Sequence, residues 1–224
     1  MGIRDEVAAL KRERTIEAAV ELFYERGYEN TTLEAVAERL GVTKPFIYTH
    51  FSAKSELLAE ICSRGIASAL RALDSVLALN LSPADKLAEL GRRFITAVLE
   101  SQKHIAIFAR EEKNLLPEDF RRINAMRRDF DRKFADLLAE GVKRGEFRIA
   151  DPHLAALAIG GMVSWAYVWY RPNGRLTMAE LAEEMSRLVL AMVQARPAET
   201  PAPRPAGPDA ARSRSAAKTG TRRR

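Results

Sequence analysis

The sequence predicts an all-α protein, and two observations support this. Apolar residues recur at spacings of three and four along most of the first 195 positions, whereas the alternating pattern of a half-buried strand is nearly absent. Glycines that follow an apolar stripe, and Ser, Thr, Asp or Pro residues that precede the next one, divide the chain into about nine helices. With 224 residues, of which 47% are hydrophobic, the chain is long enough for one or two domains with a sizeable core.

The first expected helix follows a polar lead-in, residues 1 to about 10, that we expect to be partly disordered. The helix runs to Arg26, places Ile16, Val20 and Phe23 on one stripe, and ends at Gly27. Its apolar stripe is well suited to support the two helices that follow it.

The next two helices lie between Thr31 and Leu58, a stretch with the spacing of a helix, a tight turn and a second, short helix. Thr32 is a good N-cap for the first, and Gly41 ends it because glycine readily takes the left-handed conformation. Thr43 caps the second, with Pro45 in its first turn. Three apolar residues would point inward: Val42, Ile47 and Phe51. The other side chains of this short helix project outward, as in the recognition helix of a helix-turn-helix.

A helix-turn-helix binds double-stranded DNA, so the side chains that it exposes are candidate contacts. Residues at the start of the recognition helix would meet base edges, whereas Thr32 and Lys54 would meet phosphates. Phe46 would either contact a thymine methyl group or pack sideways, and His50 would either donate to a phosphate or cap the helix end. The candidates are Thr32, Thr43, Lys44, Pro45, Phe46, Tyr48, Thr49, His50 and Lys54. Four residues just upstream of or within the first helix would reach phosphates or form a solvated face: Arg4, Lys11, Arg12 and Arg14.

This stretch resembles the DNA-binding domain of the tetracycline-repressor (TetR) family. In that family a glycine-valine turn, a short helix ending in Tyr-x-x-Phe and a following lysine recur, here as Gly41, Val42, Tyr48, Phe51 and Lys54. The resemblance covers roughly the first sixty residues. It implies a homodimeric transcriptional regulator, most often a repressor, and for Tyr48 a contact to the DNA backbone.

The net charge of +6 does not itself indicate DNA binding. Residues 196–224 carry eight Lys or Arg against two acidic residues, which leaves residues 1–195 neutral. The local pattern is more informative, because the stretch from Arg39 to Ser55 contains Arg39, Lys44 and Lys54 and no acidic residue. The Ala, Pro and Arg-rich segment 196–224 is expected to be a disordered tail that either adds sequence-independent affinity for DNA or keeps the protein dissolved.

The sequence divides into a DNA-binding domain, residues 1–58, and a helical domain for ligand binding and dimerisation, residues 59–195. The fourth helix, from Ser55 towards Leu79, would belong to both, so that a tilt of this helix repositions the DNA reader. Four helices should follow: one from Pro83, one over Gln102 to Glu112, one from Pro117 and one over Leu154 to Tyr170.

The last two helices predict a homodimer. The segment from Leu154 to Tyr170 is apolar on every side, so it should be covered on every side. The ninth helix has an apolar seam spaced for lengthwise packing on another helix: Met178, Leu181, Met185, Leu188 and Met192. We expect helices eight and nine to meet their copies in a four-helix bundle, which would hold two DNA readers about 34 Å apart on a palindrome.

The segment WAYVWYRPNGRLT, residues 165–177, resembles a branch of the family that senses acyl-CoA thioesters. This implies a small-molecule effector, with Arg171, Arg175 or an arginine of helix seven at its phosphates. The expected ligand-binding residues are Phe94, Val98, Phe108, Met126, Phe130, Trp165, Trp169, Arg171 and Arg175. Members of that branch carry arginines where this chain has Gly161 and Trp169, so a lipophilic drug-like effector of an efflux or stress regulator stays open. The aromatic residues are equally consistent with plain core, and the helix-seven arginines with a solvated face.

Other classes of function find less support. The three histidines, His50, His104 and His153, are far apart in the sequence, and no metal-ligand cluster, phosphate-binding glycine loop or nucleophile motif is present, so we expect neither an enzyme nor a cofactor or metal. A protein that coats DNA without sequence preference is a third class. Cys62 should be a small buried residue, and the charged N-terminus predicts a cytoplasmic protein. The apolar run 154–170 is shorter than the roughly 20 residues of a membrane span.

Overall fold

The structure, a computed structural model, describes residues 2–194, and over this range it contains helices and no strands. The prediction of an all-α fold is therefore confirmed. The α-helices are α1 (Ile3–Arg26), α2 (Leu33–Leu40), α3 (Lys44–Tyr48), α4 (Lys54–Leu77), α5 (Pro83–Glu100), α6 (Gln102–Glu111), α7 (Pro117–Lys143), α8 (Pro152–Ser164), α9 (Ala166–Trp169) and α10 (Met178–Met192). A short 3₁₀ turn, Glu112–Asn114, links α6 to α7. The expected tail, residues 196–224, lies outside the described range.

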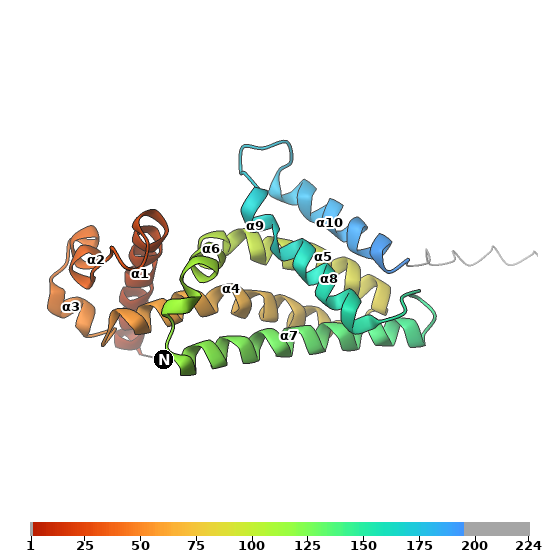
Figure 1. Ribbon diagram of the computed structural model, residues 1–224, viewed down its shortest axis with the longest axis horizontal. Helices are drawn as coiled ribbons and strands as arrows, with labels where there is room; N and C mark the ends of the chain where they lie inside the picture. Colours follow the sequence, from red (N-terminus) through yellow and green to blue (C-terminus); the bar gives the residue numbers. More distant parts are fainter. Residues whose placement is uncertain (1, 195–224) are drawn as a thin grey trace, which may run out of the picture.

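The first three helices form a small head at one end of an elongated molecule (Figure 1). The expectation of a partly disordered lead-in is wrong for the described residues, because α1 already begins at Ile3. Asp5 stabilises this start by accepting a hydrogen bond from the backbone N–H of Gly2 at 3.1 Å. The apolar stripe of α1 packs as predicted, with Ile16 and Phe23 fully buried.

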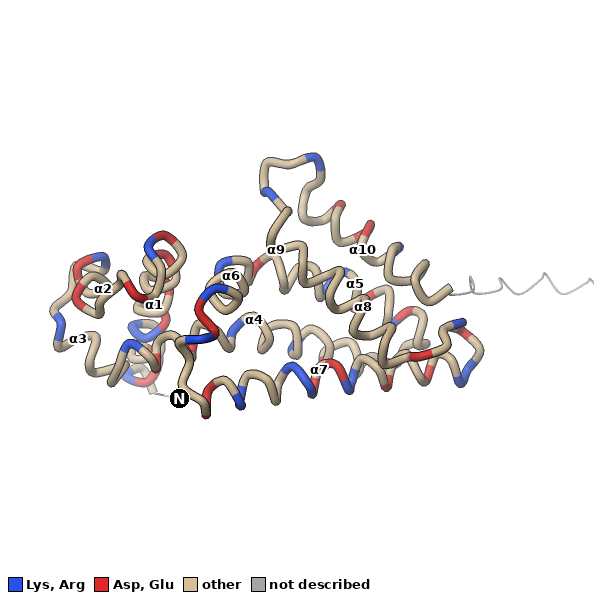
Figure 2. Tube along the Cα trace, in the orientation of Figure 1, with Lys and Arg blue, Asp and Glu red and all other residues tan. Residues whose placement is uncertain are grey.

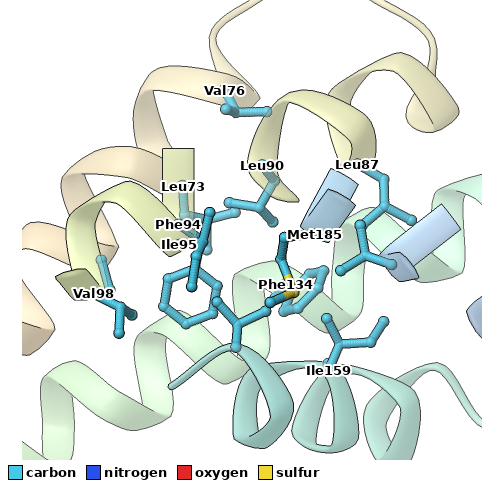
Figure 3. Packing of buried hydrophobic residues seen from close by; sticks show 14 of the residues in the cluster. Leu73, Val76, Leu87, Leu90, Phe94, Ile95, Val98, Phe134, Ile159 and Met185 are labelled. Atoms are coloured by element: carbon cyan, nitrogen blue, oxygen red, sulfur yellow. The ribbon is translucent and has the colours of Figure 1, made fainter. Parts of the chain in front are cut away.

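Two hydrophobic clusters hold the molecule together. The first fills the head, but it also includes Ile107 and Phe108 of α6 and Ile123 of α7. The second joins α4, α5, α7, α8 and α10, and Figure 3 shows Phe94, Phe134 and Met185 meeting at its centre. Because α4 contributes to both clusters, the head and the larger domain share one continuous helix, as the sequence predicts.

The segment expected to form one helix from Leu154 to Tyr170 is divided at Trp165 into α8 and α9. It is also not covered on every side, since Leu154 is 62% exposed and Trp165 is 60% exposed within this one chain. Figure 2 shows that α8 and α9 carry no charged residue. The outer surface of α8 is therefore both apolar and exposed to solvent in the single chain.

The apolar seam predicted for the ninth helix, which is α10, is divided between two faces. Leu181 and Met185 are buried within the chain, where α10 packs on α5. Gly91 of α5 allows this contact, because a Cβ atom there would lie 2.8 Å from the Cα atom of Ser186. Leu188 and Met192 are exposed instead. Among the described helices, none has the length and apolar composition that crossing a membrane would require.

Candidate functional site

The helix-turn-helix has the local geometry that its sequence predicts. Thr32 caps α2 by accepting a hydrogen bond from the backbone N–H of Ala35 at 3.2 Å, and Gly41 ends the helix with φ of 67°. Thr43 occupies the N-cap of α3 but makes no capping hydrogen bond, so its hydroxyl group is available to another molecule. Ile47 is fully buried and fixes α3 against the head.

The exposed surface of α3 is smaller than the sequence predicts. Thr43, Lys44, Pro45, Tyr48 and Thr49 are exposed. The hydroxyl of Thr49, however, donates to the carbonyl oxygen of Phe46 at 2.7 Å and is used at the helix end. Thr43, Lys44, Pro45 and Tyr48 therefore form the outward face of the recognition helix.

Within the chain, Phe46 packs sideways against its neighbours. Its half-buried ring lies 5.4 Å from the ring of His50, measured between centroids, in an edge-to-face arrangement. The Lys11 ammonium lies 5.6 Å from the centre of the same ring. Phe46 thus joins the start of α1 to the end of α3, and His50 takes part in the same contact.

The positive charges of residues 39–55 are compensated in space, which corrects the local excess inferred from the sequence. Arg39 pairs with Glu25 at 3.0 Å, and Lys44 pairs with Glu34. The hydrogen bond from Lys44 lowers the pKa of Glu34, and the same contact raises the pKa of Lys44. Both acidic partners lie on an earlier helix, Glu25 on α1 and Glu34 on α2, and the fold of the head brings them to these cations.

Lys54 also has partners within the head. Its ammonium donates to the carbonyl oxygens of Tyr28 and Thr31, both at 2.9 Å, and lies 4.2 Å from the centre of the Tyr28 ring. These contacts tie the start of α4 to the loop between α1 and α2. An ammonium group has three N–H donors, so one remains for another acceptor.

A cavity of about 490 Å³ lies between α4, α5, α6, α7 and α8. Four residues expected to bind a ligand line this cavity: Phe94, Val98, Phe108 and Phe130. The cavity lies where the two hydrophobic clusters meet, because Phe108 belongs to the head cluster and Phe94 to the larger one. A molecule in the cavity would therefore contact the core of the head directly.

The other five expected ligand-binding residues do not line the cavity: Met126, Trp165, Trp169, Arg171 and Arg175. The wall contributed by α8 consists of Leu157, Gly160, Gly161 and Ser164. Trp165 follows Ser164 by one position, which turns its side chain by about 100° around the helix, away from the cavity. Arg171 donates to the carbonyl oxygens of Val168 and Tyr170, both at 2.9 Å, and so closes the end of α9.

One wall of the cavity is polar and comes from a single face of α7. Its side chains are Asn124, Arg127, Arg128 and Asp131, at the three and four residue spacing of one helix face. Among the described residues, none of the four has an ion pair or a side-chain hydrogen bond. The Arg127 guanidinium lies 4.9 Å from the centre of the Phe108 ring. Burial raises the pKa of Asp131, and the charges of Arg127 and His153 oppose this effect.

The arginines of α7 thus fall into two groups, which the sequence did not separate. Arg122 pairs with Asp119 at 3.0 Å and Arg132 with Asp129 at 2.6 Å on the outer face. Arg127 and Arg128 face the cavity instead. The spacing of polar residues along α7 is the available signal, but it is a weak one because long surface helices commonly carry many charges.

A second feature that the sequence analysis missed is the contact between α6 and the head. Glu111 is 5% exposed, and its carboxylate accepts from the backbone N–H of Tyr28 at 3.2 Å. It also accepts from Nε of Arg110 at 2.9 Å, and Arg110 in turn donates to the last carbonyl oxygens of α1. Since Phe108 of the same helix lines the cavity, α6 connects the cavity wall to the head.

Comparison with known proteins places the chain in a family. A family model described as "Bacterial regulatory proteins, tetR family" matches residues 16–61. A second, described as "Tetracyclin repressor-like, C-terminal domain", matches residues 80–193, which is half of the chain. The chain belongs to the TetR family. It is therefore a helix-turn-helix transcriptional regulator, as the motif between Thr31 and Leu58 indicates.

Individual members of the TetR family are similar along most of the chain. The transcriptional repressor KstR2 of Rhodococcus jostii RHA1 is 28% identical over 182 residues, which cover 80% of this chain and 89% of that protein. The crystal structure of PfmR from Thermus thermophilus has a TM-score of 0.73 at 30% identity and covers 80% of this chain and 97% of that one. The structure of AibR in complex with isovaleryl coenzyme A and operator DNA has a TM-score of 0.71 at 26% identity and covers 83% and 100%.

Proposed function

We propose that this TetR-family regulator is a homodimeric repressor of a palindromic operator and is released by an anionic effector with an apolar body, an acyl-CoA thioester being the class that fits. The observation that carries this proposal is the cavity, in which the unpaired Arg127 and Arg128 face an otherwise mainly apolar lining. Anionic oxygens would bind the guanidinium groups, and an acyl chain would fill the space between the aromatic rings.

The size of the cavity is that of a small-molecule site, and a structural relative of the chain supports the effector class. A volume of about 490 Å³ is within the range of roughly 300–1,000 Å³ that is usual for small-molecule sites. AibR, which has a similar fold, is a protein whose structure contains isovaleryl coenzyme A together with operator DNA. In our proposal, Arg127 and Arg128 bind the phosphates. Arg171 and Arg175 do not line the cavity and are not part of the proposed site.

For the operator, Thr43, Lys44, Pro45 and Tyr48 are proposed to face the DNA groove and its borders. Thr32 and the free donor of Lys54 would meet phosphates, while Phe46, Thr49 and His50 would act mainly by holding α3 in place. Lys44 has to exchange its contact with Glu34 for a phosphate when DNA binds.

Dimerisation through α8, α9 and α10 would cover the apolar surface that one chain leaves exposed. This surface includes Leu154 on α8, Trp165 at the end of α8, and Leu188 and Met192 on α10. Exposed apolar side chains on two helices that contact each other, as α8 and α10 do, are typical of a protein interface. A two-fold axis there would give two heads, and so two half-sites about 34 Å apart.

Release would follow from a population shift between two spacings of the heads. An effector that fills the cavity contacts both hydrophobic clusters and α6, and it would favour an arrangement in which the heads no longer match successive major grooves. Only a difference in effector affinity between the two arrangements drives this shift.

The proposal is tested by DNA-binding titrations on an operator selected from random duplexes. Acyl-CoA thioesters should lower the DNA affinity of the wild-type protein, and the variant Arg127→Ala/Arg128→Ala should lose this response while binding DNA normally. Arg132→Ala, on the outer face of α7, is the matched control and should respond like the wild type. Release only by uncharged lipophilic compounds would instead favour an efflux or stress regulator, and uniform footprint protection would favour a DNA-coating protein.

A further inference from the structure

Asp131 is a carboxylate in a mainly apolar cavity and has no partner in the described part of the chain. The other acidic residues of this part of α7 are paired. Asp129 contacts Arg132 at 2.6 Å and Lys133 at 2.9 Å, and Asp136 contacts Arg132 at 3.4 Å. Only Asp131 among these three lines the cavity.

The spacing of charged residues along α7 does not explain why Asp131 has no ion pair in the described part of the chain. Arg127 and Arg128 precede it by four and three residues, which are the two spacings at which opposite charges on a helix usually meet. Arg127 lies against the ring of Phe108 instead. Along the axis of α7, the positions of Arg127 and Asp131 are about one turn, or roughly 6 Å, apart.

An unpartnered carboxylate at this place discriminates between ligands. Phe130, the residue before it, also lines the cavity and lies 4.9 Å from Phe94, measured between ring centroids, so an apolar chain among these rings would lie close to Asp131. A purely hydrocarbon ligand would remove water from Asp131 and return no hydrogen bond, which is costly for a charged group. A ligand with a hydroxyl group next to Asp131 would donate the hydrogen bond that the displaced water no longer supplies.

We propose that Asp131 is a specificity-determining residue that accepts a hydrogen bond from a hydroxyl group on the apolar part of the effector. The inference rests on the proposed function, because it assumes that an anionic effector with an apolar chain enters this cavity. Within that class it predicts that hydroxyacyl thioesters are preferred over saturated thioesters of the same length.

The test is calorimetric titration of the full-length protein with hexanoyl-CoA and 3-hydroxyhexanoyl-CoA, without DNA. The wild type should bind the hydroxylated compound about tenfold more tightly, because its hydroxyl group replaces a hydrogen bond that the partly buried carboxylate otherwise loses to the ligand. Asp131→Leu should bring the ratio close to one. Asp131→Asn keeps an acceptor oxygen but loses the charge, so it should strengthen binding of both compounds and reduce the ratio only in part.

Asp136→Asn is the matched control, since it removes a carboxylate from the outer face of the same helix, and its ratio should equal that of the wild type. Thermal unfolding of each variant confirms that it is folded. If the wild type binds both thioesters equally, or if Asp131→Leu keeps the preference, the role of Asp131 is refuted while the proposed effector class stands. If neither thioester binds the wild type, the proposed effector class itself is wrong, and this inference falls with it.

Discussion

The contact of Glu111 with the head gives a prediction whose size follows from the structure. Glu111→Gln keeps the shape of the side chain but removes its charge and turns one acceptor oxygen into a donor group. The carboxylate now accepts three hydrogen bonds, from Tyr28 N–H at 3.2 Å, Arg110 Nε at 2.9 Å and Asn114 Nδ2 at 2.9 Å. Hydrogen bonds to charged groups contribute about 1.5–3 kcal/mol and neutral ones about 1 kcal/mol.

The expected loss is about 2 kcal/mol. The bond from Asn114 turns into a contact between two donors unless Asn114 rotates, the bond from Tyr28 loses its charge assistance, and the bond from Arg110 keeps only the charge of its donor. The side chain of Arg110 is 46% exposed, so solvent screens the ion pair and we assign little to it beyond the hydrogen bond. For a chain of this size, 2 kcal/mol corresponds to a fall in Tm of about 4–8 °C.

Thermal unfolding followed by circular dichroism measures this change, and Glu112→Gln is its control. Glu112 is the next residue and is exposed, without an ion pair among the described residues, so its variant should melt like the wild type. Because Glu111 holds the loop before α2, Glu111→Gln should also weaken operator binding and reduce the effect of the effector on it. Equal melting of the two variants would refute the idea that α6 holds the head through this residue.

Three further predictions follow from other parts of the molecule. Glu34→Gln frees Lys44, so operator binding should become tighter and should depend more steeply on salt. In anisotropy titrations at several salt concentrations, the slope of log K against log salt should become steeper by about 0.9 for each head. An unchanged slope would contradict the proposed phosphate contact. Gly91→Ala brings a Cβ within 2.8 Å of the backbone of α10 and should cost about 1–3 kcal/mol in chemical unfolding, whereas Gly160→Ala meets no atom within 4 Å and should be near neutral. Burial raises the pKa of the Cys62 thiol to about 12, so up to pH 9 a thiol reagent should modify the folded protein far more slowly than the unfolded chain. Since the pKa is higher in the folded state, this thiol stabilises the fold below pH 9 and loses that contribution between pH 9 and about 12. Fast labelling at pH 8 would contradict its burial.

Local features of this fold were predictable because their causes are local. The cap at Thr32, the left-handed turn at Gly41 and the start of α5 after Ser82 each depend on residues a few positions apart. The helix-turn-helix could therefore be located to within one or two residues. Its outward face, Thr43 to Tyr48, followed from the burial of Ile47.

Features that depend on distant contacts were not predictable from one sequence. The pairing of Arg39 with Glu25 needs the fold of the head, and without it the stretch from residue 39 to 55 looks like free positive charge. That Trp165 lies outside the cavity wall was not predictable, because composition does not show which side of α8 faces the cavity. The spacing of Arg127 and Asp131 places both residues on one face of α7, but the sequence does not show that α8 covers this face.

The central claim is that two recognition helices, held at a fixed separation by the C-terminal helices, read a palindrome, and that an occupied cavity changes this separation. Footprinting on a selected operator, at protein concentrations from dimer to monomer and with and without an acyl-CoA thioester, tests it most directly. The account predicts two protected half-sites, centred about 34 Å apart, that are lost together on dilution and on addition of the thioester. Protection of a single half-site at full affinity by the monomer would contradict it.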